Sequence, residues 1–282
     1  KNIEEILQYI NEGKIEQVNY TIPFYANMNG DSFSFYKQLE EAQNANYTAF
    51  INIGDFSIIS ASPELFFQLQ NNEIKVKPMK GTIERGKTYE EDIKNKQWLE
   101  SSLKNRMENK LTVELMMKDL QNIAKSNTIK LEKEFQVEKY PTVYQMTSTL
   151  SATLSSDKSF IDIWKALFPS GSITGLPKKK AMKLISTLEK EPREVYCGAI
   201  GYITPFRQAI FNVPIRTAYI NNHNGYAIYG AGGGITKNSL QEEEYNEVIA
   251  KTKVLYNKQS EFQLLESLGL SNGEYIVLDY HL

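Results

Sequence analysis

Lys80 lies in the segment KPMKGT (residues 77–82), where a proline and a glycine constrain the backbone on either side of a lysine. Pro78 fixes its own backbone at the end of an expected strand, and Gly81 permits a close approach or an unusual turn. A lysine that is shielded from water loses its proton more easily and becomes a nucleophile or a base. The alternative is a solvated lysine in a lysine-rich hairpin, and the segment alone leaves both interpretations open.

Glu64 is a second residue that could carry chemistry. It ends the segment SPE (residues 62–64), sixteen residues before Lys80 and at the start of an expected strand over residues 65–69. A carboxyl group that faces inward at this point could donate or accept a proton. The alternative is an ordinary glutamate in a turn.

Glu244, Glu247 and Lys251 follow one another at spacings of three and four residues, which places all three on one face of a helix. Such a set forms either a surface ladder of ion pairs or part of a Mg2+ site, because Mg2+ favours carboxylates and water. Glu108 could supply a ligand from a second helix. The spacing alone favours the surface ladder.

Arg216 lies within the otherwise apolar run at residues 209–220. Because Pro214 cannot donate a ladder hydrogen bond, we expect this strand at a sheet edge or with a bulge. A buried arginine needs an anionic partner. A substrate carboxylate and a structural Asp or Glu are equally acceptable partners.

Two glycine-rich segments could bind an anion through exposed backbone N–H groups. Gly230 to Gly234 is expected to link a strand to the last helix, and residues 169–175 form a Gly/Ser turn before another helix. Ordinary loop geometry is the alternative for both. Neither segment matches the dinucleotide fingerprint, and no Walker lysine follows them.

The composition of the 282-residue chain, with 41% hydrophobic and 23% charged residues, is that of a soluble globular protein. A net charge of −2 gives no reason to expect a nucleic-acid partner. His223, His281 and the lone Cys197 leave no zinc spacing, no histidine-based triad and no internal disulfide. There is no candidate membrane span and no signal peptide, so we expect a cytoplasmic protein.

Hydrophobic periodicity and turn residues predict the elements that must position these side chains. We expect helices over residues 3–10, 32–41, 160–167, 176–190 and 240–267, and one long helix or two stacked ones over residues 89–125. Strands are expected over residues 18–25, within 47–70, and over 74–78, 129–137, 143–154, 195–204, 208–220 and 226–229. Strands in consecutive groups favour a layered α+β fold with largely antiparallel sheets flanked by helices. Residues 1–282 are expected to form a single domain.

Taken together, these segments resemble the chorismate-binding enzyme family, which includes anthranilate, aminodeoxychorismate, isochorismate and salicylate synthases. Their order and spacing match the family across nearly the whole chain, which is more specific than any single motif. The resemblance implies the family's layered α+β fold. The matching stretches are residues 17–19, 62–64, 78–82, 104–109, 168–178, 196–202, 214–218 and 230–251.

The resemblance implies a role for each candidate. Mg2+, held by Glu108 and Glu247 with Glu244 acting through water, would bind the ring carboxylate of chorismate. Lys80 would add to ring carbon C2 while Glu64 helps the C4 hydroxyl to depart, and ammonia would then add at C4. The implied substrate-binding residues are Gly81, Thr82, Tyr202, Arg216, Gly232, Gly233, Gly234 and Lys251.

Lys80 favours one branch of the family. Aminodeoxychorismate synthases typically carry a lysine here, whereas anthranilate and isochorismate synthases typically carry an alanine. The implied product is 4-amino-4-deoxychorismate, which leads to para-aminobenzoate and folate. A separate glutamine amidotransferase subunit would supply the ammonia. The alternatives are an anthranilate synthase and a non-catalytic scaffold that binds the amidotransferase.

Three departures from the family pattern bear on these roles. Gln145 occupies a place where many members have histidine, so any acid–base duty of that histidine is absent. Asn105 stands where anthranilate synthases carry a second acidic residue, and residues 113–119 replace the usual Val-Asp-Leu-x-Arg-Asn-Asp. The chain is also short at its N-terminus, so we expect no tryptophan feedback site.

Overall fold

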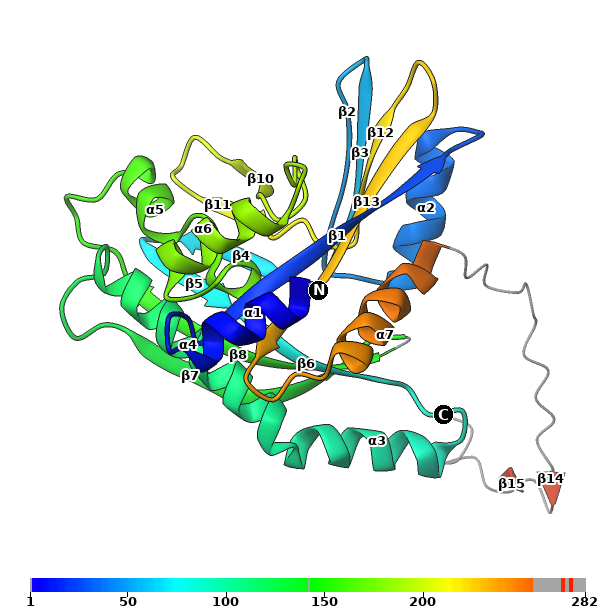
Figure 1. Cartoon of the computed structure of the whole chain (residues 1–282), viewed down its shortest axis with the longest axis horizontal. Coiled ribbons are helices and arrows are strands. Elements are labelled where there is room, and N and C mark those ends of the chain that lie inside the picture. The colour runs from blue at the N-terminus through cyan, green and yellow to red at the C-terminus, as the bar shows by residue number, and fades with distance from the viewer. Residues whose placement is uncertain (1, 142, 256–269, 272–273, 276–282) are drawn as a thin grey trace.

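The computed structural model describes residues 2–141, 143–255, 270–271 and 274–275 (Figure 1). Its helices are α1 (Asn2–Asn11), α2 (Ser32–Gln43), α3 (Tyr89–Ser101), α4 (Leu103–Gln121), α5 (Phe160–Leu167), η1 (Gly171–Ile173), α6 (Lys178–Leu188), α7 (Gln241–Thr252) and η2 (Lys253–Leu255). Its strands are β1 (Gln17–Asn27), β2 (Tyr47–Asn52), β3 (Phe56–Ser62), β4 (Leu65–Gln70), β5 (Glu73–Lys77), β6 (Met79–Glu84), β7 (Lys130–Lys139), β8 (Val143–Thr153), β9 (Gly175–Leu176), β10 (Ile200–Ile203), β11 (Ala209–Asn212), β12 (Thr217–Asn221), β13 (Tyr226–Thr236), β14 (Leu270–Ser271) and β15 (Glu274–Tyr275).

Two antiparallel sheets organise the fold. The first has the order β2-β3-β12-β13-β1-β9, and the second has the order β10-β11-β4-β5-β8-β6, with β7 also paired to β8. The strand pairs within the described residues are antiparallel throughout. The predicted α+β layered fold is therefore confirmed.

Helices cover the sheets with apolar faces and so form separate cores (Figure 1). Helices α2 and α7 pack on the first sheet, α1 and α6 pack near one end of β1 and β13, and α4 and α5 pack on the second sheet. Burying these side chains removes apolar area from water, which is the main force that holds each layer in place. The fully buried side chains include Ile6, Leu39, Ile59, Phe66, Phe67, Leu69, Ile74, Leu120 and Leu150.

Two short connections carry the chain between the sheets. The connection from β3 to β4 leaves the first sheet for the second, and the connection from β11 to β12 returns. Val213 N of the returning connection donates to Glu64 O of the first at 3.1 Å, and Ala61 N at the end of β3 donates to Arg216 O at 3.1 Å. This junction brings a carboxyl group and a guanidinium group to the line where the sheets meet.

The returning connection corrects the expected strand over residues 208–220. The run is divided into β11 and β12, which belong to different sheets. Neither lies at an edge, but β11 contains a bulge, the other expected outcome, between Phe211 and Asn212. The division falls where Pro214 lacks a backbone donor and where Arg216 has a φ of 52°, a value that strands do not adopt. An apolar run alone does not reveal such a break.

The glycine-rich run corrects a second expectation. Gly230 to Gly234 is not a loop but the end of β13, which pairs with β1 from Tyr226 to Thr236. Glycine disfavours strands in general, but here a side chain would not fit. A Cβ atom at Gly232 would lie 2.3 Å from Tyr20 O.

Three further boundaries differ from those expected. Residues 195–199 form turns rather than the start of a strand, and β10 covers Ile200–Ile203 alone. Residues 79–84 form β6, which the sequence did not predict. The last helix ends at Thr252 and is followed by η2, and residues 256–267 of the expected helix lie outside the described residues.

The charged stretch at residues 89–125 forms two helices, as one of the two interpretations expected. Ser102 separates them, and its hydroxyl accepts a hydrogen bond from Asn105 N at the start of α4. Within the described part of the chain, no helix is long and apolar enough to cross a membrane.

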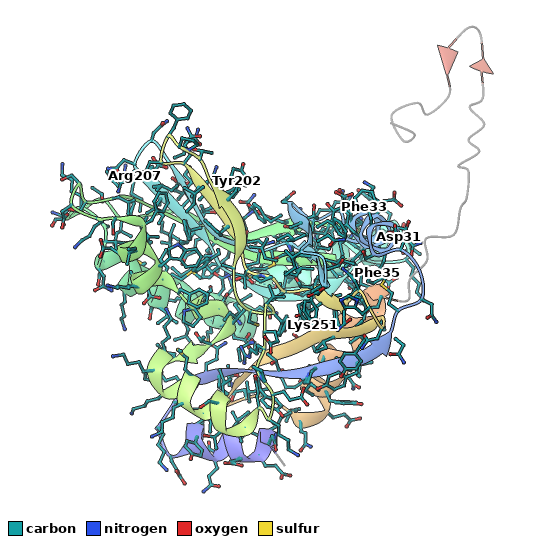
Figure 2. The ribbon with its side chains drawn as sticks, turned by 90° about the horizontal axis from the view of Figure 1, so that it is seen from above. Asp31, Phe33, Phe35, Tyr202, Arg207 and Lys251 are labelled. Atoms are coloured by element: carbon teal, nitrogen blue, oxygen red, sulfur yellow. The ribbon has the colours of Figure 1, made fainter. Side chains whose placement is uncertain are left out.

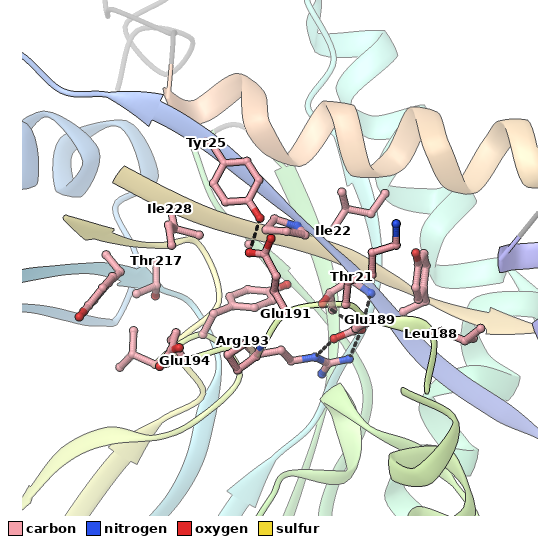
Figure 3. Close-up of a pocket in the computed structure, with 18 of the residues that line it drawn as sticks. Thr21, Ile22, Tyr25, Leu188, Glu189, Glu191, Arg193, Glu194, Thr217 and Ile228 are labelled. Carbon is pink, nitrogen blue, oxygen red and sulfur yellow. Dashed lines mark hydrogen bonds and ion pairs between the residues drawn. The ribbon is translucent and has the colours of Figure 1, made fainter. Parts of the chain in front are cut away.

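A buried ion pair clamps the loop after α6 onto the first sheet (Figure 3). Arg193 donates to both oxygens of Glu189 at 2.7 Å, and Glu189 Oε1 accepts from the Thr21 backbone N–H at 2.9 Å. The same guanidinium donates to Ile173 O and Asn19 O, each at 2.8 Å. The clamp therefore fixes η1 and β1, both of which contribute to the cavity described below.

We predict that the Arg193→Ala variant loses about 3–5 kcal/mol of unfolding free energy, because it leaves a buried carboxylate unpaired. The side chains of Arg193 and Glu189 are only 14% and 8% exposed. Chemical denaturation measures the loss. The matched control is Lys96→Ala, which removes an exposed pair with Glu100 (47% exposure for each side chain) and should cost less than about 1 kcal/mol. Equal losses in the two variants would contradict the clamp.

Candidate active site

A polar cavity of about 160 Å3 lies at the junction of the two sheets. It gathers twelve of the thirteen predicted site residues from both sheets and from helices α4 and α7. The predicted residues that line it are Glu64, Lys80, Gly81, Thr82, Glu108, Arg216, Gly232, Gly233, Gly234, Glu244, Glu247 and Lys251.

Lys80 lies at a bulge in β6, where the pairing with β8 shifts between Met79 and Thr82. The bulge includes Gly81, which has a φ of 93°. Lys80 Nζ donates to Ser172 O at 2.9 Å. Burial lowers the pKa of Lys80, and the charge of nearby Glu108 opposes this effect only in part. The half-buried Lys80 is therefore not a solvated lysine in a hairpin, and it loses its proton more easily than a solvated lysine does.

Glu64 is 3% exposed, and its Oε1 atom has no hydrogen-bond partner among the described residues. Burial raises the pKa of Glu64 to about 7, although a hydrogen bond from Ser172 favours the charged form. At neutral pH this carboxyl group can therefore both give and take a proton. Such burial is inconsistent with an ordinary turn glutamate.

Arg216 is half-buried and is held in a left-handed backbone conformation. In the part of the chain that the structure describes, Arg216 forms no ion pair with an Asp or Glu. Its guanidinium donates to Gln43 Oε1. Burial lowers the pKa of Arg216. Of the two partners that the sequence left open, a structural carboxylate is thus absent among these residues, and the side chain is available to an anionic ligand.

The glycine-rich end of β13 presents backbone donors to the cavity. Asn19 and Thr21 of β1 direct their N–H groups away from β13, to Thr174 O and Glu189 Oε1. Asn19 and Gly234, like Thr21 and Gly232, therefore face each other without exchanging hydrogen bonds. In such a pair both residues turn their N–H groups outward, so the N–H groups of Gly234 and Gly232 point away from β1. The described part of β12 stops short of this edge. The predicted anion-binding donors are therefore provided by a strand edge.

Three carboxylates lie around one side of the cavity. Glu244 is buried and accepts from Ser239 Oγ at 2.6 Å, and burial raises its pKa. Burial likewise raises the pKa of Glu108. Burial would raise the pKa of Glu247 too, but the ion pair with Lys251 at 2.6 Å outweighs it and lowers that pKa.

The carboxylates of Glu244 and Glu247 could provide part of the ligand set of a hard cation. A Cβ atom at Gly233 would lie 3.2 Å from Glu244 Oε2 and 3.8 Å from Glu247 Oε1, so both carboxylates face the same point. Within the described residues, no three His, Cys, Asp or Glu side chains form a complete ligand set for a metal ion. Water and a substrate carboxylate would have to complete the shell, as Mg2+ commonly requires.

Tyr202 does not lie with the other predicted residues. It is 64% exposed on β10, and Figure 2 shows it well away from Lys251. The tyrosine of this segment that lines the cavity is Tyr196, which the sequence analysis missed. Its ring lies against the backbone of Gly230, where a Cβ atom would be 2.4 Å from Tyr196 Cδ1. The expected strand over residues 195–204 did not predict this arrangement. Residues 195–199 lie outside β10, and there the side chain of Tyr196 faces the cavity.

The three departures from the family pattern lie in different surroundings. Gln145 is buried and lines the cavity, and Asn105 lies against Gly81 at its wall. The segment at residues 113–119 lies further along α4, where Asp119 forms an ion pair with Lys178 at 2.8 Å. Two of the three departures therefore alter the cavity itself.

A second cavity, of about 290 Å3, shares Tyr196 and Gly230 with the first. Figure 3 shows this second cavity. It is larger, but its prominent polar side chains bind one another. Tyr25 donates to Glu191 at 2.5 Å, and Arg193 pairs with Glu189. The smaller cavity, with a lysine of lowered pKa and a buried, unpartnered carboxyl oxygen, is the better candidate for chemistry.

Comparison with known proteins points the same way. Aminodeoxychorismate synthase component 1 of Escherichia coli (strain K12) is 36% identical over 251 residues, covering 89% of this chain and 55% of that protein. Anthranilate synthase component 1 of Saccharolobus solfataricus is 34% identical over 253 residues, covering 90% and 60%. The chain thus spans somewhat more than half the length of these two relatives.

The fold has a close counterpart among solved structures. Anthranilate synthase component I from Streptococcus pneumoniae matches with a TM-score of 0.83 at 31% identity, covering 91% of this chain and 56% of that one. Residues 1–257 match the family model described as chorismate binding enzyme. The cavity residues fall within that match, and the chain belongs to the chorismate-binding enzyme family.

Proposed function

We propose that the chain converts chorismate and ammonia to 4-amino-4-deoxychorismate and water. One observation carries the proposal: Lys80, with a lowered pKa, shares a cavity with Glu64, whose pKa is raised to about 7. A neutral amine and a protonated carboxyl group are the nucleophile and the acid that this substitution needs. Aminodeoxychorismate synthases among the relatives also support this assignment.

In the first half-reaction the neutral Nζ of Lys80 forms a bond to ring carbon C2. The ring double bonds shift, and the C4–O bond breaks. Glu64 gives its proton to the departing hydroxyl group, which leaves as water. A covalent route of this kind divides one difficult displacement into two easier ones.

In the second half-reaction ammonia forms a bond to C4, and the double bonds shift back. The C2–N bond breaks and returns its electron pair to Lys80. Glu64, now a carboxylate, takes the surplus proton from the new C4 ammonium group. Both side chains thus return to their starting states, and a pKa of about 7 suits Glu64 to both proton transfers.

The remaining side chains bind the substrate. Arg216, Lys251 and the N–H groups of Gly232 and Gly234 are placed to hold its carboxylates. The cavity is lined by four carboxyl and four basic side chains, so their formal charges cancel before a dianionic substrate enters. We assign Glu108, Glu244 and Glu247 to Mg2+, which supplies the missing positive charge when bound.

We further propose a glutamine amidotransferase as partner. The Escherichia coli relative is named as component 1, a name that implies a second component. Free ammonia is scarce at neutral pH because its ammonium form dominates, so a partner that releases ammonia from glutamine would supply the nucleophile where it is needed.

Product identification tests the proposed reaction. We predict that the protein, given chorismate, Mg2+ and ammonium, forms aminodeoxychorismate, and that Lys80→Ala forms none while still binding chorismate. Mass spectrometry of the products checks both. Anthranilate with release of pyruvate would identify an anthranilate synthase instead, and unchanged chorismate would favour a non-catalytic scaffold.

The raised pKa of Glu64 predicts the alkaline limb of the pH profile. Glu64 must be protonated in the first half-reaction. The kcat/KM for chorismate should therefore fall in proportion to proton concentration above a pKa of about 7. Glu64→Gln should lower kcat by roughly 10²–10⁴-fold and abolish this limb. An unchanged limb in the variant would assign the titration to another group.

The carboxylate assignment predicts a change in Mg2+ dependence. Glu244→Gln should raise the Mg2+ concentration needed for chorismate binding by roughly 10–100-fold, as loss of an outer-sphere carboxylate does elsewhere. Titration calorimetry without ammonia measures this binding independently of turnover. The matched control is Glu243→Gln, an exposed glutamate on the same helix, which should leave the Mg2+ dependence unchanged. Equal effects of the two variants would contradict the assignment.

A further inference from the structure

Two buried polar atoms lack a hydrogen-bond partner among the described side chains, and both belong to the same cavity. They are Glu64 Oε1 and Gln145 Oε1. Each residue is only 3% exposed, so bulk water does not compensate for the missing bonds. A buried acceptor without a donor costs folding free energy. The cavity is therefore complete only when a ligand brings N–H or O–H donors to this pair.

Gln145 is held rigidly. It lies on β8, where it is opposite Thr82 of β6 on one side and Glu138 of β7 on the other. A strand paired along both edges cannot easily shift, so the direction of its side chains is fixed by the pleat. Thr82 and Lys80 of the neighbouring strand line the same cavity. The amide of Gln145 is thus a fixed acceptor in the cavity that also contains the proposed nucleophile, Lys80.

The chemistry of the ligand follows from what the cavity already contains. The carboxylates of chorismate are acceptors, which suit Arg216 and Lys251 but not a second acceptor. The C4 hydroxyl departs with the proton of Glu64. Ammonia, by contrast, carries N–H donors and one lone pair, so it can donate to two acceptors and still direct its lone pair at carbon.

We propose that Gln145 and Glu64 together form the binding position of the ammonia nucleophile. This inference rests on the proposed function. Once Glu64 has given up its proton, its carboxylate accepts one N–H of ammonia while Gln145 accepts another. The lone pair then forms the C4–N bond, the C2–N bond to Lys80 breaks, and Glu64 takes the surplus proton. Gln145 orients ammonia without exchanging a proton. An amide can do this, so the histidine that many family members have at this position is not needed for it.

Steady-state kinetics with ammonium chloride as the varied substrate tests this position. Gln145→Met keeps the length of the side chain but removes the amide oxygen, and it should raise the KM for ammonium about tenfold. Gln145→Glu retains an acceptor and should return that KM to near the parent value. The KM for chorismate, and its dissociation constant measured without ammonium, should stay unchanged in both variants.

The matched control is Gln136→Met on the adjacent strand β7, at a residue that does not line the cavity. Thermal unfolding establishes that each variant is folded, and Gln145→Leu replaces Gln145→Met if the latter is not. An unchanged KM for ammonium would overturn the inference while leaving the proposed function intact. A parallel rise in the KM for chorismate would assign Gln145 to chorismate instead. A parent protein that binds chorismate but forms no aminated product would overturn both.

Discussion

The hydrogen bonds between the two connections that cross from sheet to sheet determine where the chemistry can take place. Val213 N donates to Glu64 O between the two connections, and Ala61 N at the end of β3 donates to Arg216 O, so the connections are held side by side. Neither sheet alone could bring together a carboxyl group, a guanidinium group and the lysine of β6. Because each connection enters a well-packed sheet at both ends, the groups at the junction cannot move away from one another. The geometry of the site is thus a consequence of sheet order.

Burial at this junction gives the side chains their reactivity. Removing water disfavours the charged form of any titratable group, so the pKa of Glu64 rises while that of Lys80 falls. The two shifts are useful together, since each makes the neutral form of its group more accessible than it is in water. Among the described residues, two buried acceptor atoms in the cavity, Glu64 Oε1 and Gln145 Oε1, have no hydrogen-bond donor. A ligand that supplies hydrogen-bond donors to these atoms would remove the free-energy cost of leaving them without a partner, and this would contribute to its binding.

Much of this site could be predicted from sequence, because residue type and order survive in the motifs. The fold class is the predicted one. Twelve of the thirteen predicted site residues line one cavity. What failed was the local backbone. The bulge that carries Lys80 and the strand formed by Gly230 to Gly234 depend on pairing with distant strands, which no short window reveals. Tyr202 was predicted in place of Tyr196 because the sequence pattern did not reveal the turn after α6. That turn directs Tyr196, and not Tyr202, into the cavity.

Mass spectrometry can detect the proposed bond between Lys80 and the substrate. The protein is mixed with chorismate and Mg2+ in the absence of ammonia and quenched in acid, and its mass is measured before and after digestion. We expect the intact protein to be heavier than the parent by the mass of chorismate less one water, and the added mass to lie on the peptide that contains Lys80. Protein that turns over when ammonium is present yet never carries this mass, under any quench time, would contradict the covalent route and require direct attack by ammonia.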